Sequence, residues 1–433
     1  MIATERLERE LDDFDRNRRS EALTYLWRAA EHGEIALAKP GVEVNLHAHT
    51  FFSYNAYGYS PSKFAWLARK TGLAAAGIVD FDVLDGVDEF LAAGRLVGLK
   101  TCASLESRVF VPEFANLVMN SPGEPGVAYH MGVGFPRSVA HPFLAEMRAA
   151  AGQRTRGMIG RVNAYLDPVT LDFNRDVAPL TPAGNATERH LCEAYERKAV
   201  ETFPDSARRA AFWTERLGGA PTESGKLQAL IRAKTMKQGG VGYVAPDRGS
   251  FPEMAKMNRF VAEAGAIPTV TWLDGSSEGE RRMEDLVDIA IASGAAALNV
   301  IPDRNYTPGS PDDKVKNLYA VVALAERRGF PVVAGTEMNA PGQKFVDSFS
   351  SAELKPLAAT FLRGAYIIYA HSVLERELGL GYLSPWANAS FASVAAKNDF
   401  FTAAGRALRP GAEEKLSALD AEVSPKQLLA SLK

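Results

Sequence analysis

Two histidines separated by one residue form the part of the sequence best suited to chemistry. They are His47 and His49, in the segment Asn45-Leu-His-Ala-His-Thr50 at the end of an apolar run. Side chains two residues apart in a strand point to the same face, so the two imidazoles are expected side by side. Neutral imidazoles that converge can hold zinc, manganese or iron. Because a pair of this kind is common by chance, its meaning depends on the residues that accompany it.

Acidic residues and a further histidine occur at or near the ends of other predicted strands. They are Asp80 and Asp82, Glu106, His130 and Glu337. In α/β barrels and open parallel sheets the active site lies at the carboxyl ends of the strands and takes residues from several of them. Each residue alone has a structural explanation, such as a helix cap, an arginine partner or a core position. Their joint placement predicts instead that they converge on one site.

The elements that must position these residues are seven short apolar runs separated by segments of helical periodicity. The predicted strands are Val42–His49, Ala74–Asp82, Lys100–Phe110, Val127–Phe135, Ile267–Leu273, Ala297–Pro302 and Pro331–Met338. Helix start signals lie between several of them, including Ser60-Pro61. This alternation predicts an α/β protein with a parallel sheet, open or closed into a barrel.

The regular alternation stops between Pro136 and about Gly265, where helical patterns such as Thr187–Thr202 and Ser206–Leu217 dominate. We therefore expect an N-terminal helical segment at 1–40, the first part of the α/β body at 41–135, and a mainly helical insertion at 136–265. The second part of the body is expected at 266–383, and peripheral helices at 384–433. The first segment has an amphipathic pattern, which we interpret as a packing or oligomer element.

Composition and charge exclude several classes of protein. Hydrophobic residues make up 46% of the chain and charged residues 23%, which is ordinary globular usage and excludes disordered and collagen-like chains. The 49 Lys and Arg against 52 Asp and Glu give a net charge of −3, which provides no general attraction to nucleic acid or to an anionic membrane. Two cysteines in so long a chain exclude a disulfide framework. The charged N-terminus has no apolar leader, and no stretch reaches the roughly 18 apolar residues of a membrane span. We expect a cytoplasmic protein with a small-molecule substrate, which the N-terminal helices could assemble into a homo-oligomer.

With these residues in view, the chain resembles the polymerase and histidinol phosphatase (PHP) family of metal-dependent phosphoesterases. The resemblance rests on HAHT at His47–Thr50, IVDFD where the family pattern is close to TDHD, the Leu-Glu of the third strand, YHMGVGF, and GTEMN where the family has roughly GSDAH. It covers about Val42–Phe135 and Ile267–Asn339 and skips the insertion. It implies a distorted (β/α)7 barrel that hydrolyses phosphate esters with a metal-activated water.

The resemblance also implies a ligand set. His47, His49, Glu106 and Glu337 would hold one metal, and Glu106 would bridge to a second metal at His130.

The chain departs from the family pattern at several ligand positions. Asn55, Phe81 and Asn339 stand where the family has the three histidines of its third metal, and the histidine of the fifth strand end is replaced within Thr269–Asp274. Losses in several segments imply a degenerate site. We therefore expect one divalent ion, or two, of zinc, manganese or iron.

The chemistry expected of such a site is hydrolysis of a small phosphate ester. A divalent ion with an open position lowers the pKa of water toward about 7 and polarises a phosphoryl oxygen. Asp80, near the metal but not an obvious ligand, is the predicted catalytic acid or base. Cationic side chains must replace the charge of the missing ions, and the predicted substrate-binding residues are Arg304, Arg154, Arg189 and Asn339.

Two other hypotheses compete with this one. Gly275-Ser-Ser277-Glu-Gly279 matches the hydrolase pattern G-x-S-x-G, which would give a serine hydrolase with Ser277 as nucleophile and His371 as base. Ser277 with Glu280 also forms an ordinary capping box, which favours a structural role. The lost ligands motivate the second hypothesis, a non-catalytic binding or regulatory module of PHP-like fold. The joint retention of His47, Glu106 and His130 favours the enzyme.

Overall fold

The computed structural model describes residues 2–246, 249–306, 313–420 and 422–432. Its central sheet has seven strands in the order in which they occur along the chain. The strands are β1 (Val44–Ala48), β2 (Ala75–Phe81), β3 (Thr101–Phe110), β4 (Val127–Val133), β5 (Ile267–Trp272), β6 (Ala297–Val300) and β7 (Val332–Ala334). Each lies within one of the segments predicted from the apolar runs, because a strand buried on both faces must be apolar on both.

The first and last strands meet beyond their carboxyl ends and close the sheet into a barrel. The backbone N–H of His49 donates to the carbonyl of Glu337 at 2.8 Å, and the N–H of Glu337 donates to the carbonyl of His47 at 2.7 Å. Gly335 permits this approach, since a side chain there would collide with the backbone nitrogen of His47. The predicted fold class, an α/β barrel of seven strands with a helical insertion and N-terminal helices, is confirmed.

The expectation of an entirely parallel sheet is wrong at β4, which runs antiparallel to both β3 and β5. Residues 111–126, which join β3 to β4, contain one short turn at Pro112–Phe114 and no crossover helix. A parallel neighbour requires a crossover, whereas a loop of this kind returns the chain in the opposite direction. The antiparallel pairing of β4 determines on which face of the sheet each of its side chains lies, including that of His130.

Helices surround the barrel on its outside. They include α3 (Pro61–Thr71), α4 (Val87–Val97), α9 (Met254–Glu263), α10 (Glu278–Arg281), α11 (Met283–Ala292) and α12 (Asp313–Arg328). The N-terminal helices α1 (Ile2–Glu10) and α2 (Arg16–Glu31) pack on α3 and α4, and a buried ion pair joins Arg19 of α2 to Glu89 of α4. The amphipathic pattern near the N-terminus thus corresponds to two helices docked on the barrel.

Helix α13 (Ala358–Leu378) packs against the barrel and the C-terminal helices. The segment Lys355–Leu378 is long and apolar enough to cross a membrane by length and composition, but 67% of its most apolar window is buried inside the protein. Ser372 donates to the carbonyl of Phe135, and a side chain at Gly364 would collide with the carbonyl of Val332. These close contacts make α13 a core helix of this fold.

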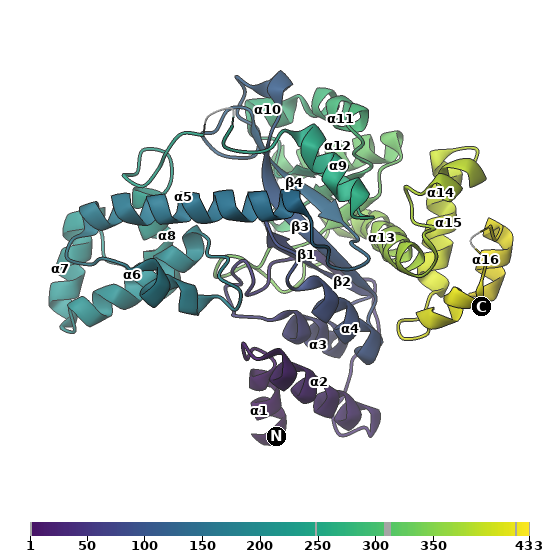
Figure 1. The fold of residues 1–433 in the computed structure, drawn as a ribbon, viewed down its shortest axis with the longest axis horizontal. Coiled ribbons are helices and arrows are strands. Elements are labelled where there is room, and N and C mark those ends of the chain that lie inside the picture. Colours follow the sequence, from purple (N-terminus) through teal and green to yellow (C-terminus); the bar gives the residue numbers. More distant parts are fainter. Residues whose placement is uncertain (1, 247–248, 307–312, 421, 433) are drawn as a thin grey trace.

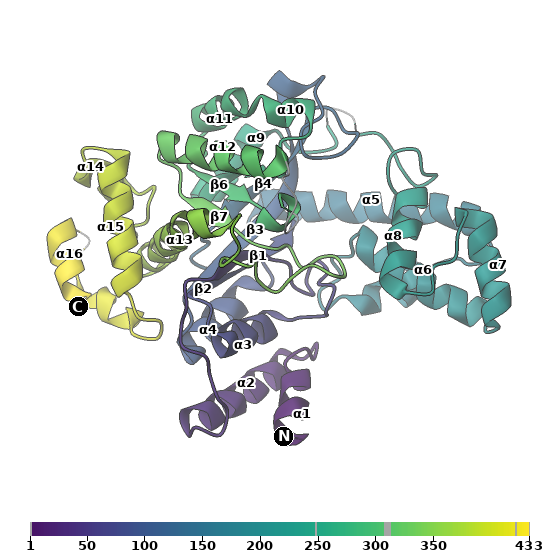
Figure 2. The same ribbon diagram turned by 180° about the vertical axis from the view of Figure 1, so that it is seen from behind.

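The C-terminal helices α14 (Pro385–Ser390), α15 (Val394–Ala407) and α16 (Pro425–Ser431) lie beyond α13, on the side of the barrel away from the insertion (Figure 1). The view from behind gives the same arrangement, with the insertion and the C-terminal helices at opposite ends (Figure 2).

The insertion extends from one side of the barrel and has a hydrophobic core of its own. Helix α5 (Pro142–Leu166) runs outward to α6 (Glu188–Thr202), α7 (Ser206–Leu217) and α8 (Ser224–Thr235) (Figure 1). Leu191, Tyr195 and Trp213 are among the buried residues of its core, which forms a cluster separate from that of the barrel. Helix α9, which ends the predicted segment 136–265, packs on β3, β4 and β5 and so belongs to the barrel.

Candidate metal centre

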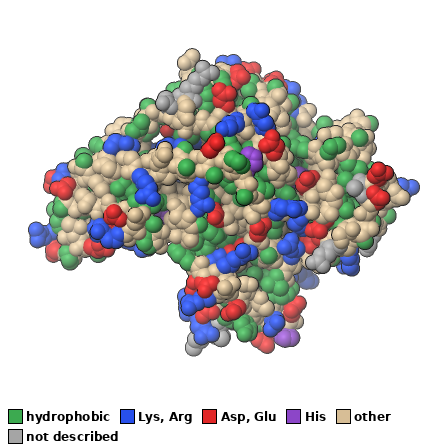
Figure 3. Space-filling model, viewed as in Figure 1, with side chains coloured by type: hydrophobic (Ala, Val, Ile, Leu, Met, Phe, Trp, Pro, Cys, Tyr) green, Lys and Arg blue, Asp and Glu red, His purple; other side chains and the backbone are tan. Residues whose placement is uncertain are grey.

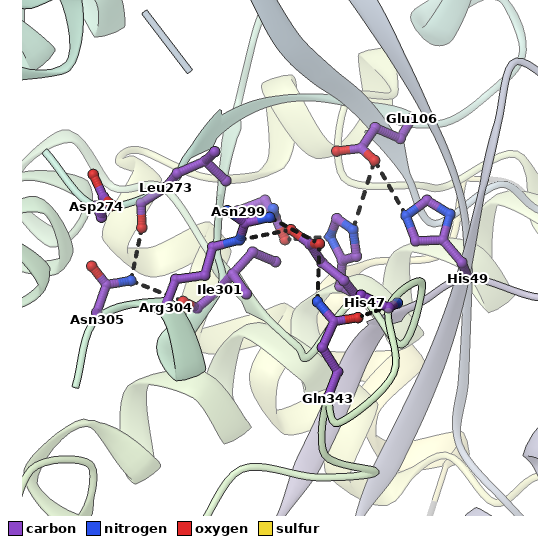
Figure 4. Close-up of polar contacts among 12 residues, drawn as sticks. His47, His49, Glu106, Leu273, Asp274, Asn299, Ile301, Arg304, Asn305 and Gln343 are labelled. Carbon is purple, nitrogen blue, oxygen red and sulfur yellow. Dashed lines mark hydrogen bonds and ion pairs between the residues drawn. The ribbon is translucent and has the colours of Figure 1, made fainter. Parts of the chain in front are cut away.

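Three side chains from two strands converge at the mouth of the barrel. His47 in β1 and His49 just beyond it point to the same side, as their spacing predicts, and Glu106 of β3 faces them (Figure 4). The Nε2 atoms of His47 and His49 lie 3.9 Å and 3.4 Å from Oε2 of Glu106. The ligand atoms of the three residues all lie within 4.8 Å of one another.

The second nitrogen of each imidazole is fixed by a neighbour. Nδ1 of His47 lies 3.1 Å from Oδ1 of Asn299 in β6, and Nδ1 of His49 lies 3.0 Å from Oγ of Ser53. Ser53 donates its own proton to Asp80, so its oxygen accepts from His49. Each ring therefore carries its proton on Nδ1 and turns the lone pair of Nε2 toward Glu106, the orientation found in histidines that bind metals.

The donor set fits a divalent cation. Both Nε2 atoms are buried and have no hydrogen-bond partner among the described residues. Burial lowers the pKa of His47 and of His49, which keeps the imidazoles neutral, and burial raises the pKa of Glu106 to about 7. Two neutral imidazoles and one carboxylate, with further positions open, match the three-ligand sets of catalytic zinc and non-haem iron sites.

Glu337 lies beside this group but is engaged by a cation. Arg304 donates from Nε and Nη2 to its two carboxylate oxygens, both at 3.1 Å, and Gln343 donates to Oε2 at 3.3 Å (Figure 4). Burial raises the pKa of Glu337, but Arg304 outweighs burial and holds it at about 2. The structure thus joins a predicted metal ligand to a predicted substrate-binding arginine, a pairing that sequence spacing does not reveal.

The structure does not bring His130 to the site. His130 is paired in register with Ser107, whereas Tyr129 is paired with Arg108, which lines the cavity. Side chains opposite each other on neighbouring strands share a face, so His130 points out of the barrel, where its Nε2 contacts Asn258 of α9. Because His130 faces away from Glu106, it is not in place to bind the second metal that the resemblance implies.

Asp80 is close to the site but faces the loop that follows β1. Its carboxylate accepts from the N–H of Thr50 at 2.9 Å, from the hydroxyl of Thr50 at 2.7 Å and from Ser53 at 2.6 Å. Asp80 is buried and does not line the cavity. In this arrangement Asp80 orients Ser53, and through it His49, rather than a substrate.

Two positions of the missing third-metal histidines have other uses in this chain. The ring of Phe81 stacks on His49 with centroids 4.6 Å apart. Asn55 donates to the carbonyl of His49 and accepts from the N–H groups of Tyr57 and Tyr59, so it holds the loop together. The space around His49 is therefore occupied by an apolar ring and a structural amide.

A cavity of about 310 Å³, which we name the inner chamber, opens above these ligands. Glu106, Glu337, Arg304 and Asn339 line it from the barrel. Arg154 of α5 and Arg189 of α6 line it from the insertion, so all four predicted substrate-binding residues share one wall or another of this chamber.

The cations of the inner chamber differ in their partners. Arg108 pairs with Glu124, Arg232 and Lys237 pair with Glu188, and Arg304 pairs with Glu337. Arg154 donates to the carbonyl of Ser250, and Arg189 has no hydrogen bond or ion pair among the described residues. Burial and the nearby Arg232 lower the pKa of Arg189. Within the part of the chain that the structure describes, neither guanidinium forms an ion pair with a carboxylate, so both are available to an external anion.

Sequence reasoning placed Asp82 among the residues expected to converge but gave it no role, and it missed Arg108. Asp82 follows β2 with a φ of 58°, lines the chamber and accepts from Ser107 at Oδ1. Arg108 of β3 also lines the chamber. Counting alternate residues onward from Glu106 would have placed Arg108 on the same face, whereas the turn that redirects Asp82 has no signal in the sequence.

The serine hydrolase hypothesis does not survive the structure. Ser277 caps α10 by accepting from the N–H of Glu280 at 3.1 Å, beyond the carboxyl end of β5. His371 lies in α13, where it accepts from the N–H of Tyr382 and contacts Gly265, which precedes the amino end of β5. The two residues are at opposite ends of a strand and cannot share a proton.

Comparisons with known proteins were made for the sequence and for the fold. No protein-family model matches the sequence, and no curated protein matches it. Among solved structures, an amidohydrolase from Chromobacterium violaceum with bound sulfate and no metal is 17% identical and covers 73% of this chain and 96% of its own, with a TM-score of 0.49. A proposed metal-dependent phosphoesterase from Bifidobacterium adolescentis is 19% identical and covers 74% of this chain and 98% of its own, with a TM-score of 0.48.

Proposed function

We propose that this protein is a metal-dependent hydrolase of a phosphate monoester, with one divalent ion held by His47, His49 and Glu106. The observation that carries the proposal is the pair of buried Nε2 atoms without partners, both turned toward one carboxylate oxygen below a cationic chamber. The ion would be zinc, manganese or iron, and it would activate water and polarise a phosphoryl oxygen. The PHP resemblance agrees with this chemistry but implies more metal sites than we propose.

The protein's own residues would bind and orient the substrate. Arg154 and Arg189, which lack carboxylate partners, would hold the anionic oxygens, and Asn339 would add a neutral contact on the chamber wall. Arg304 would contribute through its exposed portion while its pair with Glu337 fixes its orientation. Such contacts would supply the positive charge that the further ions of a three-metal site provide.

We assign the proton-transfer role to Asp82 rather than to Asp80. The carboxylate of Asp80 accepts three hydrogen bonds and does not line the chamber, so Asp80 is suited to orienting Ser53. Asp82 accepts at Oδ1 from Ser107, which leaves Oδ2 free of hydrogen bonds among the described residues. Oδ2 of Asp82 is thus the carboxylate atom that would give or take a proton in the chamber.

The proposal also covers the setting of the reaction. Lys and Arg side chains are mixed with Asp and Glu over the described part of the face in Figure 3, in keeping with a small-molecule substrate rather than a nucleic acid. A cytoplasmic location and a homo-oligomer assembled through the N-terminal helices remain part of the proposal.

The test is elemental analysis of protein purified without chelator, with the variants His47→Ala and Glu106→Ala. We expect about one metal per chain in the wild type and none in either variant. His141→Ala is the matched control, because His141 caps α5 on the surface and should leave the metal in place. Hydrolysis of p-nitrophenyl phosphate should follow metal content. Protein that binds no zinc, manganese or iron would overturn the hydrolase and favour the non-catalytic binding module.

A further inference from the structure

A second cavity adjoins the inner chamber. It has a volume of about 600 Å³, and we name it the outer chamber. Arg108, Tyr129, Arg154 and Phe251 line both chambers. The two chambers are therefore parts of one continuous cleft between the barrel and the insertion.

The residues between the chambers form an ordered partition. The ring of Phe251 has the guanidinium of Arg108 at 4.3 Å and that of Arg154 at 4.8 Å from its centroid. Cation–π contacts of this kind hold flat groups in place. A ligand that passes from one chamber to the other thus meets two guanidinium groups and the aromatic ring beside them.

The two chambers differ in chemistry. The inner chamber contains the proposed metal ligand Glu106 and the guanidinium of Arg189, neither of which lines the outer chamber, whereas Arg154 lines both. The exposed wall of the outer chamber is mostly apolar, with Met158, Met236 and Val244 among its residues, and Val244 is 62% exposed. Apolar walls in contact with water favour a ligand that covers them.

Helix α5 has a glycine where it borders the outer chamber. Gly157 lines that chamber, and a Cβ built on it would meet one atom, Nη1 of Arg161, at 3.4 Å. Glycine inside a helix costs about 0.5–1 kcal/mol relative to alanine, and no close helix packing requires it here. The glycine widens the outer chamber.

We propose that the substrate is an amphiphilic phosphate monoester, whose phosphate lies in the inner chamber and whose apolar alcohol portion fills the outer chamber. The insertion then determines specificity, since α5 and the loop at 236–246 form the apolar wall. This inference rests on the proposed function and adds to it the class of the alcohol portion.

The experiment uses methyl-, butyl- and octylphosphonate, whose carbon–phosphorus bond is not a phosphate ester and so is not cleaved by the proposed reaction. Binding to the metal-loaded protein is measured by calorimetry. Each buried methylene contributes about 0.8 kcal/mol, roughly a fourfold gain in affinity, so burial of only two or three methylenes would make octylphosphonate bind about 30-fold more tightly than methylphosphonate. The variant Gly157→Leu places a branched side chain in the outer chamber and should remove most of this gain without weakening methylphosphonate.

Gly160→Leu is the matched control on the same helix. Gly160 lines neither chamber and has no atom within 4 Å of its Cβ position, and leucine favours a helix at both positions. The control should keep the preference for octylphosphonate. Arg189→Gln should instead weaken all three phosphonates about equally, by about tenfold, because it removes a charged contact to the head group.

Equal binding of the three phosphonates, or a chain-length gain that survives Gly157→Leu, would overturn the amphiphilic substrate while leaving the hydrolase intact. Failure of the proposed function would be recognised by a different measurement. The purified protein would then bind no metal, independently of its affinity for the phosphonates.

Discussion

At the scale of single residues, the candidate site depends on groups that orient the ligands as much as on the ligands themselves. Ser53 accepts from Nδ1 of His49 and donates to Asp80, so one hydroxyl fixes both the tautomer and the direction of the ring. Groups that hydrogen-bond the outer nitrogen of a metal-binding imidazole affect metal affinity strongly. The sequence predicts Asp80 as the catalytic acid or base, and only the fold shows that Asp80 acts through Ser53 on His49.

The variant Ser53→Ala tests this role. Loss of the hydroxyl frees the imidazole of His49 to rotate and to change tautomer, so we expect metal affinity to fall by about 10- to 100-fold. Metal titration measures it, with circular dichroism to check the fold. Ser20→Ala, on the exposed face of α2, should bind metal as the wild type does. An unchanged affinity in Ser53→Ala would limit the contact between Ser53 and Asp80 to loop stability.

The pair of Arg304 and Glu337 gives a second prediction at this scale. Arg304→Gln leaves a buried carboxylate without its cation and should lower the free energy of unfolding by about 3 kcal/mol at pH 7. Arg304→Gln with Glu337→Gln should recover most of the loss, and it should keep its metal, because Glu337 is engaged by the arginine and not by the metal site. Urea unfolding and metal analysis measure the two quantities. Loss of the metal in the double variant would make Glu337 a ligand, as the sequence suggested.

The same pair has a defined pH dependence. The pKa of Glu337 in the folded protein is about 2, below the usual value of 4.5. A lowered pKa contributes stability that is present above pH 4.5 and is lost as the pH falls toward 2. The difference in unfolding free energy between the wild type and the double variant should therefore shrink over that interval.

At the scale of elements, the strands could be located from sequence but their directions could not. Apolar runs of 6 to 11 residues mark all seven strands, because burial on both faces removes polar residues from each. Parallel and antiparallel strands have the same side-chain period, so nothing in Val127–Val133 announces that β4 is reversed. The strand pairing of β4 therefore determines where His130 points. A shift of one residue in this pairing would have turned His130 toward the chamber. Tyr129 occupies that face instead.

The docking of the N-terminal helices gives a prediction about pH. Asp12, which follows α1, accepts from the N–H of Ser60 at 2.9 Å and lies 3.6 Å from Nζ of Lys63. Burial raises its pKa to about 6, and the contacts with Ser60 and Lys63 offset only part of that effect. A raised carboxyl pKa contributes stability below pH 3.8 that is lost as the pH rises through 6.

The variant Asp12→Asn keeps an acceptor for Ser60 and removes the titration. Amide hydrogen exchange measures how often α1 opens. Opening should become more frequent in the wild type between pH 4 and 7 and stay constant in the variant. At pH 7 the variant should be protected about 100-fold more, since the pKa rises by about two units, from 3.8 to about 6, and each unit corresponds to a factor of ten. Weaker protection of the variant at pH 7 would mean that the ion pair with Lys63 outweighs the cost of burial.

At the scale of the whole molecule, chemistry and recognition are divided between two hydrophobic cores. The barrel carries the candidate metal ligands on β1 and β3, and the insertion carries Arg189 and the apolar wall of the outer chamber. Each unit has its own cluster of buried residues. Under the proposed function, the barrel would carry out the reaction, and the insertion, which has no recognisable motif, would select the substrate.

Separate cores predict separate unfolding. Leu191 is fully buried in the core of the insertion, and Leu191→Ala should cost about 2–5 kcal/mol there. Trp213 is the tryptophan of the insertion, so its fluorescence should report a transition at lower urea concentration in this variant. Metal bound in the barrel adds stability only to the barrel, about 2.7 kcal/mol at a hundred times its Kd, so the second transition should move with metal and the first should not. Leu298→Ala, in the barrel core, should reverse the pattern. A single transition that responds to both substitutions and to metal would show instead that the cleft couples the two units, in which case ligands of the outer chamber would also stabilise the metal site.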